Sequence, residues 1–136
     1  MEIAYSLKEL PKIAQYLINE SNSKVLCFYG DMGVGKTTLI KELVTLLGCM
    51  ASTSSPTFGI VNEYPNENGD TVAYHFDFYR LNDEIEALDF GVEDYLYSNK
   101  WVLIEWPNKI KGLLPQNTTN IFLEIVSESK RKLLIE

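Results

Sequence analysis

GDMGVGKT, residues 30–37, is the stretch that decides the fold of this chain. It fits the pattern G-x-x-x-x-G-K-[ST], in which backbone N–H groups surround phosphate oxygens. The run before it, residues 24–29 (KVLCFY), is short and apolar like a buried strand, and residues 38–47 carry apolar side chains at helical spacing. The helix start adds the positive end of its dipole to the loop. The stretch therefore predicts a nucleoside triphosphate site rather than a chance glycine-rich turn, with Lys36 on the phosphates and Thr37 on Mg²⁺.

Length and composition indicate one domain spanning residues 1–136, with 46% hydrophobic and 23% charged residues. No apolar run approaches the length of a membrane span, and residues 1–10 lack the features of a signal peptide. Cys27 and Cys49 are not spaced as a metal or redox pair, so we expect buried, reduced thiols. The expected location is the cytoplasm, with no membrane partner.

The net charge and the number of arginines limit the classes of function that this chain can have. The net charge is −7, and no basic cluster is larger than residues 130–132. A protein that binds RNA or DNA alone needs a basic stripe, so any contact with nucleic acid is expected through a partner protein. Arg80 and Arg131 are the two arginines of the sequence. Kinases of small molecules use several arginines to hold phosphate, which favours an ATPase or a switch over a phosphotransferase.

The remaining pattern alternates helical and strand-like segments. Ser6 and Glu9 form a capping box at the start of a helix whose apolar face runs from Leu7 to Ile18. The other expected elements are a hairpin of 58–64 and 71–78 around Asn68-Gly69, two short helices within 82–98 broken at Gly91, a buried strand at 101–105, and a strand pair of 121–126 and 132–136.

Two strand ends carry candidate acids. Alternation places His75, Asp77 and Tyr79 on one face of their strand, where Asp77 is expected to orient the attacking water or to hold Mg²⁺ through water. Glu105 ends a buried strand, at the edge where α/β proteins bind ligands, and is a candidate Mg²⁺ ligand beside Thr37 or simply an exposed acid. Trp106 is a candidate base-stacking residue or a core residue. His75 is expected to be a hydrogen-bonded structural residue or a partner of Asp77.

A Ser/Thr-rich loop precedes the hairpin. In SSPTF, residues 54–58, hydroxyl groups are placed to sense the γ-phosphate or the Mg²⁺ shell, as switch segments do. Ser55 and Thr57 are the candidate switch residues. The alternative is a capped turn that leads into the next strand.

Taken together, a capped N-terminal helix, GDMGVGKTTL, SPTF, HFDFYRL and LIEWP resemble the TsaE (YjeE) family of bacterial P-loop ATPases over about residues 5–110. The resemblance implies an α/β, three-layer domain of the P-loop NTPase type. Its sheet would be mixed and mainly parallel, with a β-hairpin and a C-terminal strand pair. It also implies an ATPase for threonylcarbamoyladenosine formation in tRNA next to the anticodon, weak without TsaB- and TsaD-like partners. ATP hydrolysis would drive or reset that complex, with tRNA held by the partners.

The resemblance also assigns site residues. Mg²⁺ would be bound by Thr37 and Glu105, while Asp77 and Lys36 would be catalytic and Trp106 would lie near the adenine. Ser6 matches a position that touches the nucleotide. Arg131 lies beyond the well-matched region, at a place from which it could reach the nucleotide or a partner. The residues expected to surround the phosphates are Asp31, Met32, Gly33, Val34, Gly35, Lys36, Thr37 and Thr38.

Three alternatives remain open at this point. A GTP-dependent switch needs N-K-x-D, but residues 108–111 read NKIK, with Lys111 in place of the acid that reads guanine. A kinase is suggested by the letters of Asp89-Phe90-Gly91, yet no kinase catalytic loop accompanies them. The third alternative is a scaffold protein that binds ATP but hardly hydrolyses it. It differs from the ATPase interpretation only in the rate of ATP hydrolysis.

Overall fold

The computed structural model describes residues 2–50 and 59–136. Its strands are β1 (Glu2–Ser6), β2 (Val25–Tyr29), β3 (Val61–Pro65), β4 (Thr71–Asp77), β5 (Trp101–Glu105), β6 (Thr119–Ser127) and β7 (Lys130–Ile135). Its helices are η1 (Leu7–Glu9), α1 (Leu10–Glu20), α2 (Lys36–Leu46), α3 (Glu84–Asp89), α4 (Val92–Leu96) and η2 (Pro107–Leu113).

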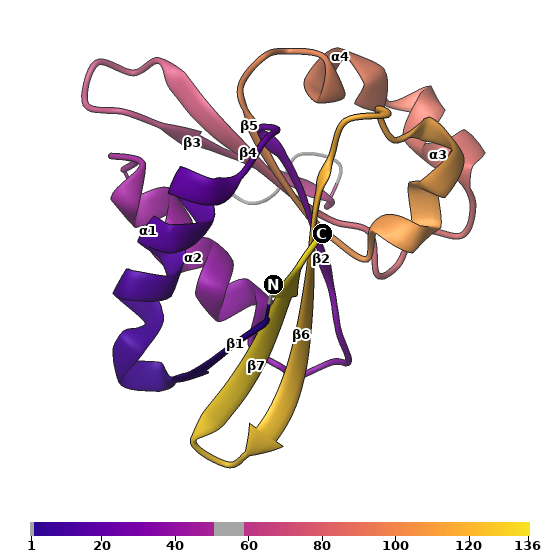
Figure 1. Ribbon diagram of the computed structural model, residues 1–136. Helices are drawn as coiled ribbons and strands as arrows, with labels where there is room; N and C mark the ends of the chain where they lie inside the picture. The colour runs from indigo at the N-terminus through magenta and orange to yellow at the C-terminus, as the bar shows by residue number, and fades with distance from the viewer. Residues whose placement is uncertain (1, 51–58) are drawn as a thin grey trace.

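All seven strands join one sheet in the order β1-β7-β6-β2-β5-β4-β3 (Figure 1). The central neighbours β6, β2, β5 and β4 run parallel, whereas β1 and β7 on one flank and β3 on the other pair antiparallel. The expected α/β class with a mixed sheet is therefore confirmed. Its parallel part is the middle of the sheet, which contains β2, the strand before residues 30–35. These residues form the loop of the predicted phosphate-binding motif, called the phosphate loop below.

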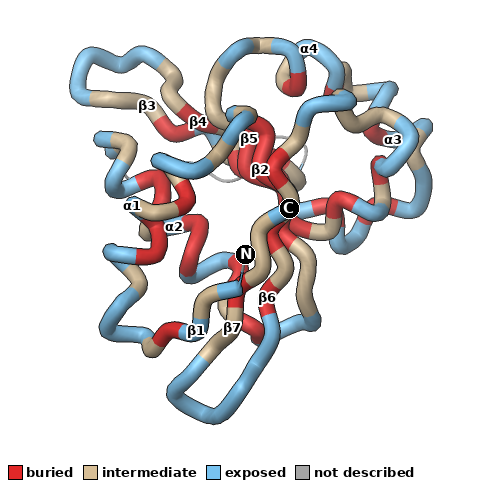
Figure 2. The backbone as a smooth tube through the Cα atoms, viewed as in Figure 1, coloured by how far each residue is buried: buried red, intermediate tan, exposed pale blue. Residues whose placement is uncertain are grey.

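Helices cover both faces of the sheet. Helices α1 and α2 pack together on one face, and α3, α4 and η2 lie on the other (Figure 1). Strand β2 shows why the middle strands are apolar throughout: Leu26 and Phe28 belong to the core under α1 and α2, while Val25 and Cys27 belong to the opposite core. Figure 2 shows this buried centre in red. A parallel strand covered on both faces has no polar side, which explains the continuous apolar run.

Most expected elements are present within the described residues. Strands β3 and β4 form the expected hairpin, Gly91 separates α3 from α4 with φ 82°, and β6 and β7 form the strand pair. The capping box exists, because the Glu9 carboxylate accepts hydrogen bonds from the Ser6 N–H at 3.0 Å and from its hydroxyl at 3.2 Å.

Two local expectations need correction. Residues 2–6 form a strand, β1, that the sequence analysis did not anticipate. The helix begins as a 3₁₀ turn, η1, which directs Leu7 outward and leaves it 53% exposed instead of in the apolar face. The residues of that face that are buried are Ile13, Ala14 and Leu17.

Both cysteines are free thiols, as expected. Cys27 is fully buried in β2, and burial raises the pKa of its thiol to about 12. Cys49 is only partly buried, so the expectation of two buried thiols is half correct. In the part of the chain that the structure describes, no helix has the length and apolar character needed to cross a membrane.

The phosphate loop rests directly on the sheet at Gly30, where φ is 153°. A Cβ atom at this position would lie 2.8 Å from the Leu123 carbonyl oxygen and 2.9 Å from Val34 Cγ1. Glycine at residue 30 therefore lets the loop turn off β2 beside β6 without this overlap.

We expect Gly30→Ala to lower the free energy of unfolding by about 1–3 kcal/mol through this overlap, in addition to backbone strain. Gly48→Ala is the matched control, because Gly48 has φ 83° but no atom within 4 Å of an added Cβ. Urea unfolding of both variants measures the difference. Equal losses would show that the contact with Leu123 does not matter.

Candidate functional site

The candidate site lies where the start of α2 meets the ends of β4 and β5. Asp77 stands opposite Glu105 in the register of β4 and β5, and Phe28, near the end of β2, stands opposite Glu105 on the other side. Leu103 belongs to the core under α1 and α2. Side chains two residues apart on a strand point to the same face, so Glu105 projects from that face of β5 as well. The sheet thereby delivers two carboxylates to the start of α2.

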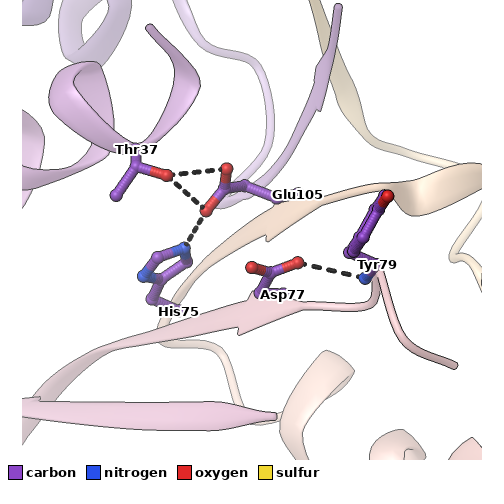
Figure 3. A network of polar contacts seen from close by, with 5 residues as sticks. All are labelled: Thr37, His75, Asp77, Tyr79 and Glu105. Carbon is purple, nitrogen blue, oxygen red and sulfur yellow. Dashed lines mark hydrogen bonds and ion pairs between the residues drawn. The ribbon is translucent and has the colours of Figure 1, made fainter. Parts of the chain in front are cut away.

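Glu105 joins three elements in one network, shown in Figure 3. The Thr37 hydroxyl lies 2.9 Å and 3.1 Å from the two carboxylate oxygens of Glu105. Nε2 of His75 lies 2.7 Å from Glu105 Oε2. Both Glu105 and His75 are buried, with 4% and 7% exposure. The expected proximity of Thr37 and Glu105 is thus observed, and the partner of His75 is Glu105 rather than Asp77.

The network keeps Glu105 ionised. Burial by itself raises the pKa of this carboxyl group, but hydrogen bonds from His75 and Thr37, together with the charges of His75 and Lys36, outweigh it. The net pKa is lower than the ordinary value for glutamate. Glu105 is therefore a carboxylate at neutral pH, fixed in orientation by two donors.

Lys36 is held in a compact arrangement inside the loop. Its ammonium donates a hydrogen bond to the Gly30 carbonyl oxygen at 2.6 Å and lies 3.7 Å from the centre of the Trp106 ring. The residue is only 5% exposed. Burial lowers the pKa of Lys36, while the carboxylates of Glu105, Asp77 and Asp31 act in the opposite direction. A cation desolvated in this way interacts strongly with an incoming anion.

Asp77 ends β4 on the open side of the site. Its Oδ1 accepts a hydrogen bond from the Tyr79 N–H at 3.0 Å, which directs the carboxylate along the strand end (Figure 3). The Tyr79 ring lies 5.1 Å from the Trp106 ring. Tyr79 was not among the predicted site residues, although its alternation with His75 and Asp77 placed it on their face.

These side chains enclose a pocket of about 280 Å³. Its lining residues are Met32, Gly33, Gly35, Lys36, Thr37, Thr38, Asp77, Tyr79, Glu105 and Trp106. The structure therefore brings together most of the predicted phosphate-binding residues with Asp77, Glu105 and Trp106. Trp106 lies against Lys36, so contact with the base stays a prediction.

Other predicted residues lie outside this lining. Asp31 is exposed at the start of the loop, and the Val34 side chain is buried in the core, 1% exposed. Ser6 is the last residue of β1 and pairs with Lys130 of β7. Ser55 and Thr57 fall outside the described residues, so the switch-loop prediction has no structural account. Arg131 contacts the loop through the carbonyl of Val34.

The donor set suits a hard cation that is shared with a phosphate ligand. Thr37 and Glu105 offer a hydroxyl and an ionised carboxylate side by side, the oxygen ligands that Mg²⁺ prefers. No group of three or more His, Cys, Asp or Glu side chains suited to a metal occurs among the residues described. Mg²⁺ sites of nucleotide enzymes have this character, since phosphates and water complete the coordination.

Comparison with known proteins identifies the family. The family model described as "Threonylcarbamoyl adenosine biosynthesis protein TsaE" matches residues 4–133. The chain belongs to the TsaE family. This TsaE protein accordingly has the P-loop NTPase-type fold of nucleotide-binding proteins.

Individual relatives of this TsaE chain cover most of its length. The "tRNA threonylcarbamoyladenosine biosynthesis protein TsaE" of Haemophilus influenzae is 35% identical over 91% of this chain and 78% of the relative. The protein of the same description from Bacillus subtilis is 37% identical over 80% of this chain and 66% of the relative. The crystal structure of YdiB from Bacillus subtilis superposes with a TM-score of 0.72 at 26% identity, covering 98% of this chain and 83% of YdiB.

Proposed function

We propose that this TsaE protein binds and hydrolyses Mg·ATP and thereby drives or resets a complex of TsaB- and TsaD-like proteins that forms threonylcarbamoyladenosine in tRNA. The observation that carries the ATPase part is the contact between Thr37 of the loop and the ionised Glu105 of β5. The family supports the tRNA part. A cytoplasmic location follows from that role.

Each side chain has a defined task in this proposal. Lys36 contacts the β- and γ-phosphates and stabilises the charge that develops during cleavage. Thr37 and Glu105 hold Mg²⁺, which neutralises phosphate charge when bound. Asp77, on the open side of the pocket, orients the attacking water. The buried His75 keeps the Glu105 carboxylate in place.

The acidic surface supports an indirect relation to tRNA. At a net charge of −7, the protein as a whole repels a polyanion such as tRNA. The partners therefore provide the tRNA contacts, and this subunit contributes the nucleotide cycle.

One experiment tests the proposed function as a whole. ATP hydrolysis is measured with the protein alone and after addition of a TsaB–TsaD-type complex, and modified tRNA is counted in the same reactions. We expect slow hydrolysis alone, faster hydrolysis with the complex, and many rounds of modification only when all components and ATP are present. Many rounds of modification without this protein would contradict the proposal.

We also expect ATP to bind more tightly than GTP. Lys111 occupies the position at which an acid would read guanine, and it lies in η2. Competition between unlabelled ATP or GTP and a fluorescent ADP analogue gives both affinities in one experiment. Equal or tighter binding of GTP would show that the base is recognised in another way.

A further inference from the structure

Arg131 connects the β6–β7 hairpin to the phosphate loop. Its Nε donates a hydrogen bond to the Val34 carbonyl oxygen at 2.9 Å. Its Nη1 donates to the carbonyl oxygens of Ser127 at 2.9 Å and Lys130 at 3.0 Å, and lies 3.5 Å from that of Glu128. One guanidinium group therefore holds the hairpin turn with one nitrogen and the loop with another. Its planar array of donors suits such a bridge, and its charge strengthens each bond.

The bond to Val34 fixes the direction of the next N–H group. In a trans peptide, the C=O and the N–H of one unit point in opposite directions, and no cis peptide bond occurs in the described residues. The Val34 carbonyl points at Arg131, so the N–H of Gly35 in the same unit points away from Arg131. Gly35 lines the pocket between the loop and Glu105. The bond to Arg131 thus directs the Gly35 N–H away from the β6–β7 hairpin.

Glycine makes this peptide easy to misplace. Gly35 has φ 106°, and it carries no side chain through which packing could hold the peptide. Val34 is anchored in the core, 1% exposed. The Val34–Gly35 peptide therefore depends on hydrogen bonds for its orientation, and Arg131 supplies one.

We propose that Arg131 is a positioning residue for phosphate binding, which holds the Gly35 N–H toward the phosphates and couples the orientation of the loop to the β6–β7 hairpin. This inference rests on the proposed nucleotide site, but it assigns Arg131 no contact with the nucleotide. The guanidinium acts through the backbone of the loop. Any displacement of the turn at residues 127–130 would reach the loop through the same group.

The test compares Arg131→Gln with Lys132→Gln. The two changes remove the same charge from adjacent residues, but Lys132 projects from the other face of β7, 3.8 Å from Glu2 and Glu124. Affinity for a fluorescent ADP analogue is measured at low and high salt. We expect Arg131→Gln to weaken binding by about tenfold or more, as loss of a charge-assisted hydrogen bond does, and Lys132→Gln to change it less than twofold.

A second measurement separates positioning from simple support of the hairpin. In ¹⁵N-labelled protein without nucleotide, we expect Arg131→Gln to shift the amide resonance of Gly35 as well as those of residues 127–130. If Arg131→Gln unfolds the protein, Arg131→Met retains the aliphatic stem and serves the same test. Unchanged ADP affinity and an unchanged Gly35 resonance would overturn the inference. Equal weakening by both glutamine variants would also overturn it, in favour of long-range charge attraction. Absence of nucleotide binding by the unsubstituted protein would instead overturn the proposed function.

Discussion

Replacing Lys36 with alanine is expected to slow ATP hydrolysis by roughly two to three orders of magnitude, as removal of a fixed donor to developing charge does. Lys36 is only 5% exposed, and burial is the main cause of the lowered pKa of its ammonium. Its interaction with phosphate is correspondingly strong, because few water molecules screen it. Single-turnover hydrolysis measured with radiolabelled ATP gives the rate.

Lys41→Ala is the matched control, because Lys41 is exposed on the same helix, α2. It should hydrolyse ATP at the unsubstituted rate. We expect Lys36→Ala to remain folded, as judged by circular dichroism. The variant loses the favourable contact between the ammonium and Trp106, but it also avoids the unfavourable burial of a charged group, so the two changes offset each other. Unchanged hydrolysis by folded Lys36→Ala would mean that residues 30–37 are not the active loop.

Asp77→Asn and Glu105→Gln are expected to fail in different ways. Asparagine retains the oxygen that accepts from the Tyr79 N–H but lacks the charge of the carboxylate that orients the attacking water. ATP should therefore bind almost normally while hydrolysis falls roughly a hundredfold. Glutamine retains the size of Glu105 but removes its charge, so the Mg²⁺ concentration needed for half-maximal activity should rise by about tenfold or more. Hydrolysis is measured over a range of Mg²⁺ concentrations.

Asp70→Asn is the control for both variants, because Asp70 is exposed in the β3–β4 turn, away from the pocket. Binding of ATP without metal should be similar in all variants, whereas binding of Mg·ATP should be weakened only in Glu105→Gln. The same Mg²⁺ dependence in Asp77→Asn and Glu105→Gln would show that the carboxylates are assigned wrongly. Many rounds of tRNA modification with either variant would break the proposed link between this site and the pathway.

The sequence predicted the parts of the molecule that depend on neighbouring residues. The strand, loop and helix at 24–47 have local patterns, and so do the β3–β4 hairpin and the break at Gly91. Strand β1 was missed because five residues offer little pattern, and their partner β7 lies at the other end of the described chain. The start of α1 was misjudged for a different reason: a 3₁₀ turn rotates Leu7 away from the face that α-helical spacing assigns to it.

The sequence indicated most of the residues that form the site, but not which of them contact one another. The G-x-x-x-x-G-K-[ST] spacing indicated Lys36 and Thr37, and the ends of strands indicated Asp77 and Glu105. The pairing of His75 with Glu105 depends on β4 lying parallel beside β5, an arrangement that residues thirty positions apart in sequence do not reveal. The contact of Lys36 with Trp106 is equally non-local. Tyr79 could have been found, because it follows the same alternation as Asp77.

The strand order has a consequence for the synthesis of this protein. Strand β2 and the loop emerge from the ribosome early, but both sheet neighbours of β2 are made later: β5, which supplies Glu105, and then β6. Glu2 of β1 can pair only after Leu134 of β7 has been synthesised, which is later still. Pairings between such distant segments are slow to form. A nascent chain that already contains GDMGVGKT therefore lacks the carboxylate and the flanking strands, and its nucleotide pocket is completed only when the sheet closes around β2.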